Sequence, residues 1–205
     1  MSEQIQLESI KKHLDKTLTY SEYKKLVGDL LKENKSTGFT QNETYLKYSK
    51  LGFSRMNRWE KTSKLTAEQI ETIQKVTKKQ TWLVITEGWC GDAAPVIPIM
   101  NKIADINPLI TFKLILRDEN DELMSQFLTN GDKSIPKLLS FNTEENDLLF
   151  TWGPRTKEAT DLVAKEKAEF GKLRDEFKVT LQKLYNQDKG KAIAEDLVNC
   201  LKQSN

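Results

Sequence analysis

The first 65 residues carry apolar side chains every three or four positions, which is the spacing of amphipathic helices. One such run follows residues 19–22, where Thr-Tyr-Ser-Glu matches a helix capping box, and a second extends from Tyr45 to Trp59. The second run also contains three basic residues: Arg55, Arg58 and Lys61. We interpret residues 1–65 as an N-terminal helical extension that packs on a core. The alternative is a surface for a thiol substrate or a partner.

Strand and helix patterns alternate between residues 66 and 165, which predicts an α/β core. In order, the pattern predicts a helix opened by a capping box at 66–69, a strand at 82–86, a helix from about Gly91 to Ala104, a strand at 110–116, a helix at 119–128, and strands at 137–141 and 148–152. The first two strands should pair in parallel because a helix connects them. Pro98 lies inside that helix and should kink it.

Residues 166–205 are more polar, with apolar side chains again at helical spacing. We predict a C-terminal helical extension: a long closing helix interrupted by Gly171, and a last helix after a break at 187–190. Its apolar stripe should pack against the N-terminal helices, or alternatively form an oligomer interface. The three zones, 1–65, 66–165 and 166–205, are expected to form one compact unit.

Composition excludes several classes of function. The 205 residues include 32 Lys and Arg against 30 Asp and Glu, so no global field favours nucleic acid or an anionic membrane. No apolar run approaches the ~20 residues of a membrane span, and the polar start lacks a signal-peptide pattern. Two cysteines do not make a disulfide framework, so we expect a cytoplasmic protein.

The segment Trp89-Cys90-Gly91-Asp92-Ala93 holds the main candidate chemistry. A cysteine where a strand turns into a helix meets unpaired backbone N–H groups and the positive end of the helix dipole, and both favour a nucleophilic thiolate. The carboxylate of Asp92 lies in the same turn and opposes this, as does that of Glu87. The alternative is an inert, buried cysteine.

Four elements in chain order resemble the thioredoxin family. They are the pair Trp89-Cys90 after a strand, Pro98 in the next helix, the pair Ile135-Pro136 before a later strand, and Gly153 after the last strand. The resemblance implies a thioredoxin fold, with a mixed central sheet flanked by helices. It implies that Trp89 and Cys90 are the active-site tryptophan and attacking cysteine. It further implies a cis peptide before Pro136, a Pro136 loop that faces Cys90, and a substrate groove that includes Ile135 and Gly153. We therefore expect Cys90 to pack close to Pro136 and to be at least partly solvent-accessible at the start of its helix.

The chain departs from the dithiol thioredoxins at two positions. Ala93 stands where the resolving cysteine would be, and Val84 replaces the buried aspartate that helps deprotonate that second thiol. The two departures are consistent with each other. Without a second thiol to deprotonate, a buried carboxylate at position 84 would only cost desolvation energy. We therefore expect a protein built around one thiol.

A narrower resemblance covers nearly the whole chain and is to a bacterial single-cysteine thioredoxin-like subfamily. It rests on Trp-Cys-Gly-Asp-Ala and on four further segments: residues 116–120, 129–131, 134–136 and 151–155. Arg117 and Arg155 could both approach the groove, or could instead form structural ion pairs. We select Cys90, Trp89 and Asp92 as catalytic candidates. The substrate-binding candidates are Ile135, Pro136, Gly153 and Arg155.

The preferred function is thiol–disulfide chemistry through Cys90, with an external thiol resolving the mixed disulfide. The partner would be a protein or a small thiol or disulfide. The alternative is a non-catalytic binding module that captures an extended peptide beside Pro136. Cluster ligation by Cys90 across a dimer ranks below both. No metal or cofactor is expected, because His13 and the distant Cys200 make no ligand set with Cys90. We expect His13 at the surface and no disulfide between the cysteines.

Overall fold

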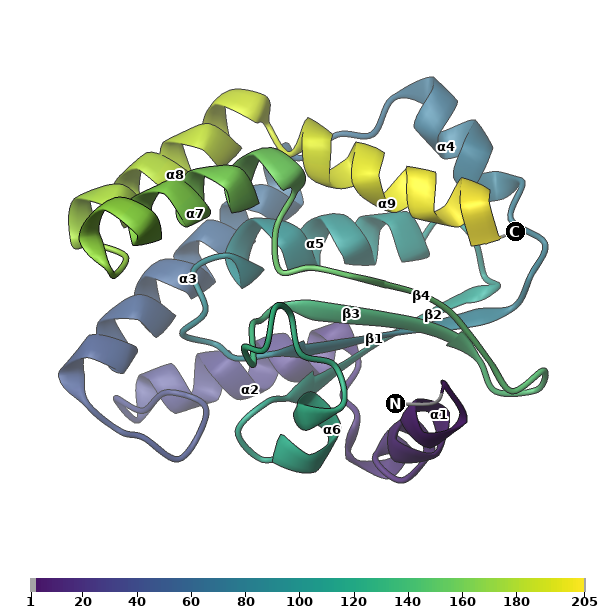
Figure 1. The fold of residues 1–205 in the computed structure, drawn as a ribbon, viewed down its shortest axis with the longest axis horizontal. Coiled ribbons are helices and arrows are strands. Elements are labelled where there is room, and N and C mark those ends of the chain that lie inside the picture. Colours follow the sequence, from purple (N-terminus) through teal and green to yellow (C-terminus); the bar gives the residue numbers. More distant parts are fainter. Residues whose placement is uncertain (1–2, 205) are drawn as a thin grey trace.

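The computed structural model describes residues 3–204 and has a four-stranded mixed sheet with helices on both faces (Figure 1). The strand order is β2-β1-β3-β4. The strands are β1 (Gln80–Thr86), β2 (Ile110–Leu116), β3 (Lys137–Asn142) and β4 (Asp147–Trp152). β1 pairs with β2 in parallel, as predicted, and with β3 antiparallel, while β3 and β4 form an antiparallel hairpin. This arrangement is a thioredoxin fold.

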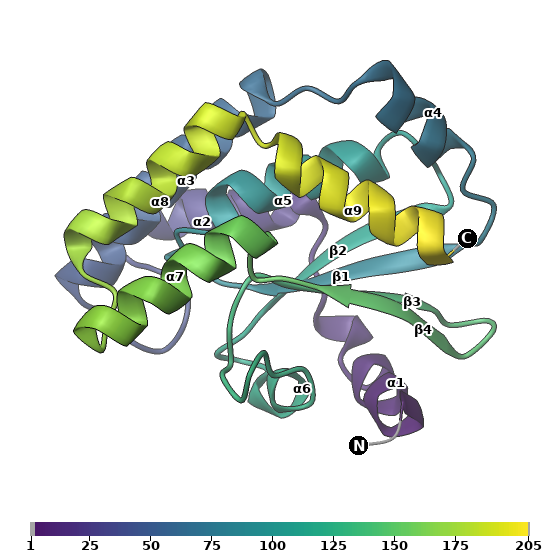
Figure 2. The ribbon, with the colours of Figure 1, turned by 45° about the horizontal axis from the view of Figure 1, so that its top comes forward.

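The helices precede, connect and follow these strands. They are α1 (Glu3–Lys11), α2 (Tyr20–Lys32), α3 (Glu43–Thr62), α4 (Ala67–Gln74), α5 (Ala93–Ala104), α6 (Asp121–Ser125), α7 (Lys157–Phe170), α8 (Asp175–Asp188) and α9 (Lys191–Ser204), with a short 3-10 turn at Leu14–Lys16. α5 and α9 cover one face of the sheet, and α1 and α6 lie on the other (Figure 2). Among residues 3–204, none of the helices has both the length and the apolarity that crossing a membrane requires.

Both predicted capping boxes are present. Thr19 and Thr66 accept the backbone N–H three residues on, and Glu22 and Gln69 accept the threonine N–H in return. Two orphan donors are thereby satisfied at each helix start. The local sequence therefore determines where α2 and α4 begin.

Two predicted helices are shorter than expected. α6 spans only Asp121–Ser125, and the chain that follows it places Phe127 in the core. The long closing helix is instead α7 and α8, since Gly171 adopts a left-handed conformation (φ 69°) and ends α7. α8 lies along α3, where Tyr48 donates to Asp175. The zone boundaries at 65 and 165 remain a prediction.

The core lies between the sheet and α5. Trp82 to Ile85 in β1 are fully buried, and α5 is buried on nearly all sides by β2, α3 and α9. An element covered on every side needs apolar residues all round. α5 therefore reads as almost continuously apolar and includes Pro98 within its length.

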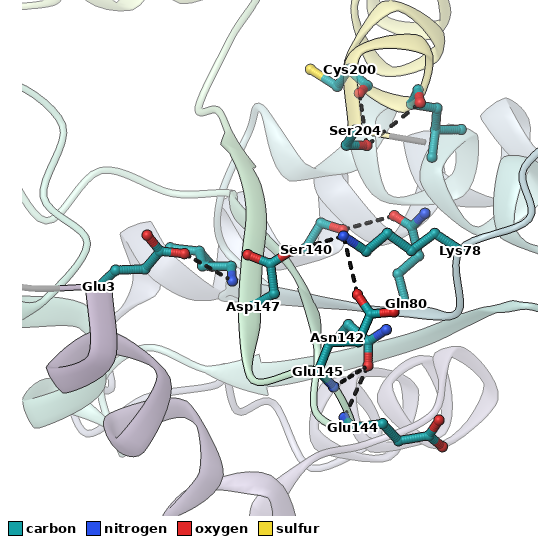
Figure 3. A network of polar contacts seen from close by, with 12 residues as sticks. Glu3, Lys78, Gln80, Ser140, Asn142, Glu144, Glu145, Asp147, Cys200 and Ser204 are labelled. Atoms are coloured by element: carbon teal, nitrogen blue, oxygen red, sulfur yellow. Dashed lines mark hydrogen bonds and ion pairs between the residues drawn. The ribbon is translucent and has the colours of Figure 1, made fainter.

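Polar contacts hold the end of the sheet where β1 begins and where the β3–β4 turn lies (Figure 3). The side-chain oxygen of Gln80 accepts hydrogen bonds from Trp82 and Ser140, which links β1 to β3. Lys78 forms ion pairs with Glu145 and Asp147 at the β3–β4 turn. These contacts fix the hairpin that carries Pro136 at its other end.

His13, the only histidine in the sequence, follows α1, and Cys200 lies in α9. Neither residue belongs to the segment between β1 and α5 that contains Cys90. The prediction of a surface His13 is wrong: the side chain is buried and its Nδ1 donates to the Ser9 carbonyl at 2.7 Å. A short helix leaves its last carbonyls open, and this ring satisfies one of them. Cys200 sits near the end of α9, where Ser204 donates to its carbonyl (Figure 3). Both cysteines are free thiols.

Candidate functional site

Cys90 lies in the turn between β1 and α5, next to the loop that precedes β3. Its Sγ donates a hydrogen bond to the Ile135 carbonyl oxygen at 3.3 Å. The Ile135–Pro136 peptide is cis. The tertiary structure thus brings together a thiol and a proline loop that are 45 positions apart in the sequence.

The thiol is more buried than expected. We predicted a partly accessible Cys90, but only 6% of the residue is exposed, so that prediction is wrong. The cover comes from α8, where Gln182 donates to the Gly91 carbonyl at 3.1 Å and Tyr185 donates to Asp92 at 2.9 Å. A helix of the C-terminal extension therefore closes over the candidate site.

Burial decides the electrostatics of this thiol. It raises the pKa of Cys90 to about 12, and the negative charge of Asp92 adds to the increase. The backbone N–H groups of Asp92 and Ala93 and the Arg155 guanidinium act in the opposite direction. The groups that favour a thiolate are therefore present, as the turn into a helix predicted, but the desolvation of the closed site outweighs them.

Asp92 and Arg155 form a nearly buried ion pair beside the thiol. Arg155 Nη2 lies 2.6 Å from Asp92 Oδ2, while Tyr185 occupies the other carboxylate oxygen. Arg155 therefore forms one of the structural ion pairs considered from the sequence, and its charge also acts on the Cys90 thiol; its place in a substrate groove stays a prediction. With its carboxylate held by two partners, Asp92 has a fixed orientation in the turn.

Trp89 is the middle layer of a stack. Its ring lies parallel to Tyr45 of α3, with centroids 4.9 Å apart, and the Arg117 guanidinium sits 4.8 Å from the ring centroid. Offset aromatic pairs and cation–π contacts each stabilise such an arrangement by about 0.5–1.5 kcal/mol. Sequence reasoning placed Tyr45 on a helix face and among the segments similar to the subfamily, but it did not connect this ring with Trp89.

Gly153 allows β4 to approach the proline loop. It has φ 116°, and a Cβ at this position would clash with the Pro136 carbonyl oxygen. Only glycine adopts this conformation without strain. Gly153, which the sequence analysis assigned to the groove, is therefore the point where the backbone after β4 lies against the backbone of Pro136.

A buried polar cluster lies at the end of β1. Glu87 is fully buried, and one carboxylate oxygen accepts from the Asp118 N–H at 2.9 Å. Its other oxygen, the Tyr23 hydroxyl and the Thr86 hydroxyl are buried without a hydrogen-bond partner among the described residues. Burial raises the pKa of Glu87. Position 84 is a valine and has no carboxyl group, but Glu87, three residues later, is a buried acid. The only sequence signal for the burial of Glu87 is the unbroken apolar run that precedes it.

Among residues 3–204 there is no group of three or more His, Cys, Asp or Glu side chains arranged to hold a metal ion. The site consists of one thiol, one ion pair, an aromatic stack and a proline loop. This set can hold and release a proton at sulfur, and it can present sulfur to a second sulfur atom.

Comparison with known proteins places the fold. The family model for thioredoxin matches residues 38–169. A protein of unknown function from Pseudomonas aeruginosa has a similar crystal structure, with a TM-score of 0.57 and 15% identity over 92% of this chain and 99% of that one. An HIV epitope scaffold is also similar, with a TM-score of 0.56 and 16% identity over 87% of this chain and 98% of that one. No curated protein matches the sequence.

Proposed function

Because this chain belongs to the thioredoxin family, we propose that it carries out thiol–disulfide exchange through the single thiol of Cys90. The observation that carries the proposal is the 3.3 Å contact from Cys90 Sγ to the Ile135 carbonyl beside the cis Pro136. We further propose that the chain represents a bacterial single-cysteine branch, since Ala93 occupies the position of a second thiol.

The chemistry needs only one protein sulfur. The Cys90 thiolate attacks one sulfur of a disulfide, a Cys90–substrate disulfide forms, and the other substrate sulfur leaves as a thiolate. An external thiolate then attacks the substrate sulfur of this mixed disulfide, so that the Cys90 thiolate leaves and a disulfide forms between the substrate and the external thiol. A second external thiolate attacks the external sulfur of that disulfide, and the substrate sulfur leaves as a thiolate. The net reduction is then complete, with the two external thiols joined in a disulfide. A reducing compartment such as the cytoplasm would supply these thiols.

The closed site makes opening part of this reaction. The resting thiol is protonated, because its pKa is about 12, and α8 covers the turn. Moving Gln182 and Tyr185 away would hydrate the site and remove the main cause of the raised pKa. The backbone N–H groups at the start of α5 and the Arg155 guanidinium would then stabilise the thiolate.

The remaining candidates take positioning roles. Ile135 and Pro136 would pair with an extended substrate segment once Cys90 releases the Ile135 carbonyl. Gly153 keeps the backbone behind that loop close, and Arg155 offers a cation to a developing thiolate. Trp89, stacked on Tyr45, would form one wall of the opened site. The partner is a protein or a small thiol or disulfide, and the scheme needs no resident cofactor.

A second candidate function is a peptide-binding module without catalysis. The observation that favours it is the burial of Cys90, since a protonated, covered thiol is a poor nucleophile. In that case the loop at Pro136 would capture an extended peptide, and the thiol would act only as a small apolar residue.

The two functions differ in one measurement. In a Cys200→Ser background, the folded protein is mixed with an aromatic disulfide that releases a coloured thiol. Exchange predicts one equivalent released, a mixed disulfide at Cys90 by mass spectrometry, and release of the adduct by an added small thiol. Cys90→Ser is the matched control. If Cys90 reacts only after unfolding, exchange is excluded and the binding module remains.

A further inference from the structure

A cavity of about 550 Å³ lies between the end of α3 and the turn that joins α8 to α9. Figures 1 and 2 show these segments side by side, on the helical side of the molecule. Its lining contains four cations: Arg58, Lys64, Lys189 and Lys191. No carboxylate lines it. The positive charge noted in the sequence around Arg58 therefore belongs to a surface built from three elements.

These cations lack counter-charges. Among residues 3–204, none of the four has an Asp or Glu oxygen within 4.0 Å, unlike the ion-paired lysines elsewhere on the surface. The neighbouring acid, Asp188, instead accepts the Ala192 N–H at 2.9 Å and caps α9. Like charges gathered in a concave site repel one another and raise the local potential. A bound anion would offset that repulsion.

The cavity wall is fixed by packing. Arg58 donates to the Asn186 side-chain oxygen at 2.6 Å and lies 5.7 Å from the centre of the Trp59 ring. Gly190 has φ 74° and packs so closely on Trp59 and Ile99 that a Cβ at this position would have to displace the end of the Ile99 side chain. The turn bearing Lys189 and Lys191 is thereby held against α3. Arg58 is thereby preorganised and loses little side-chain freedom when a ligand binds.

The lining also contains an aromatic ring and an amide. Trp59 is 3% exposed, so it forms part of the wall, but its indole N–H is buried and does not reach the open cavity. The side-chain oxygen of Asn186 already accepts a hydrogen bond from Arg58, so the polar group that Asn186 can still offer to a ligand is its side-chain NH2 donor. Most of the polar side chains that line the cavity are therefore N–H donors, which match a ligand rich in anionic oxygens.

We propose that this cavity binds a small phosphate-bearing ligand. Phosphate combines high charge with several acceptor oxygens and so can engage Arg58 and more than one lysine at once. The volume falls within the range of small-molecule sites, about 300–1,000 Å³. A long polyanion is disfavoured, because the chain carries a formal charge of only +2. The proposal does not depend on the chemistry of Cys90.

Calorimetric titration of the full chain with inorganic pyrophosphate and with inorganic phosphate tests the proposal. We expect saturable binding that is tighter for pyrophosphate. Lys189→Asn/Lys191→Gln should weaken it about tenfold or more, since the double variant removes two of the four cations that would contact the anion. Asn is chosen because position 189 has φ 58°. Lys172→Asn/Lys165→Gln removes equal charge from exposed positions outside the lining and should bind normally.

Three results would overturn the proposal. One is the absence of binding by the parent protein up to millimolar ligand. Another is equal weakening in both double variants, which would mean that only net charge matters. The third is binding of an oligonucleotide or of anionic lipid vesicles without any binding of pyrophosphate. Arg58→Gln gives an independent check, because it should weaken binding while the circular dichroism spectrum and melting temperature stay near those of the parent.

Discussion

Arg155 and Asp92 form an ion pair, 2.6 Å between Nη2 and Oδ2, and both charges act on the thiol of Cys90. Burial is the largest cause of the raised pKa of that thiol; Asp92 adds to it and Arg155 opposes it. One pair thus contributes two opposite electrostatic effects at the same sulfur. Changing either partner should move the reactivity of Cys90 in a predictable direction.

Asp92→Asn should lower the pKa of Cys90, because it removes the negative charge and leaves Arg155 as the nearest ion. The rate of alkylation by iodoacetamide, followed against pH in a Cys200→Ser background, measures this pKa. Asp161→Asn, an exposed acid in α7, is the control and should change nothing. A higher pKa in Asp92→Asn would contradict the electrostatic account of the site.

Arg155→Met should act in the opposite direction and leave Asp92 buried without its cation. We expect a slower alkylation rate and a loss of about 3 kcal/mol in the free energy of unfolding, as for a broken buried pair. Adding Asp92→Asn should recover part of that loss. Urea denaturation of the single and double variants gives the comparison. Equal stability of all three proteins would mean that the pair is not buried in solution.

The burial of Cys90 should appear in the pH dependence of stability. The folded pKa of about 12 exceeds the unfolded value of ~8.5, so the folded state keeps its proton longer. The resulting stability is complete below about pH 8.5 and is lost as the pH rises toward 12. Relative to Cys90→Ser, the protein should lose about 2 kcal/mol between about pH 8.5 and 10. Tyrosine titrations cancel in this difference, which denaturation at several pH values provides.

Gly153→Ala should destabilise the protein and disturb the loop at Pro136. The new Cβ would clash with the Pro136 carbonyl, in addition to the strain of a positive φ. Gly131→Ala is the matched control: its φ is 83°, but nothing lies within 4 Å of its Cβ position. The control should lose about 1–2 kcal/mol from backbone strain alone, and Gly153→Ala clearly more. Similar losses of stability in Gly153→Ala and Gly131→Ala would show that the loop at Pro136 can move to accommodate the new Cβ.

Ala93→Cys should restore only weak disulfide reductase activity. The new thiol would lie one helical turn from Cys90, so a disulfide is within reach. However, Val84 supplies no carboxyl to deprotonate it, and Asp92 disfavours another negative charge in the turn. Adding Val84→Asp should improve turnover at a cost in stability, because position 84 is fully buried.

Reduction of a protein disulfide, with an external thiol as donor, compares the parent, the single variant and the double variant. Activity of Ala93→Cys equal to that of a dithiol thioredoxin would refute the link between the two departures. Activity of the parent at that level would refute the premise of a single limiting thiol.

The sequence by itself determined the elements whose signals are local. The strand at 110–116 and the capping boxes at Thr19 and Thr66 appear as predicted, because side-chain periodicity and N-cap hydrogen bonds depend on neighbouring residues. The resemblance of its motifs to the thioredoxin family also implied that Cys90 lies beside Pro136, and the contact of Cys90 with the Ile135 carbonyl agrees with this.

Only the tertiary structure decided the environment of the thiol. Tyr185 lies 93 positions beyond Asp92, and Tyr45 comes from a helix that precedes the sheet, yet both pack on the same turn. Which face of a helix meets which loop depends on how all the core side chains fit together, and periodicity carries no such information. The sequence therefore identified a cysteine at a helix start, while the packing of α8 over it made that cysteine a buried, protonated one.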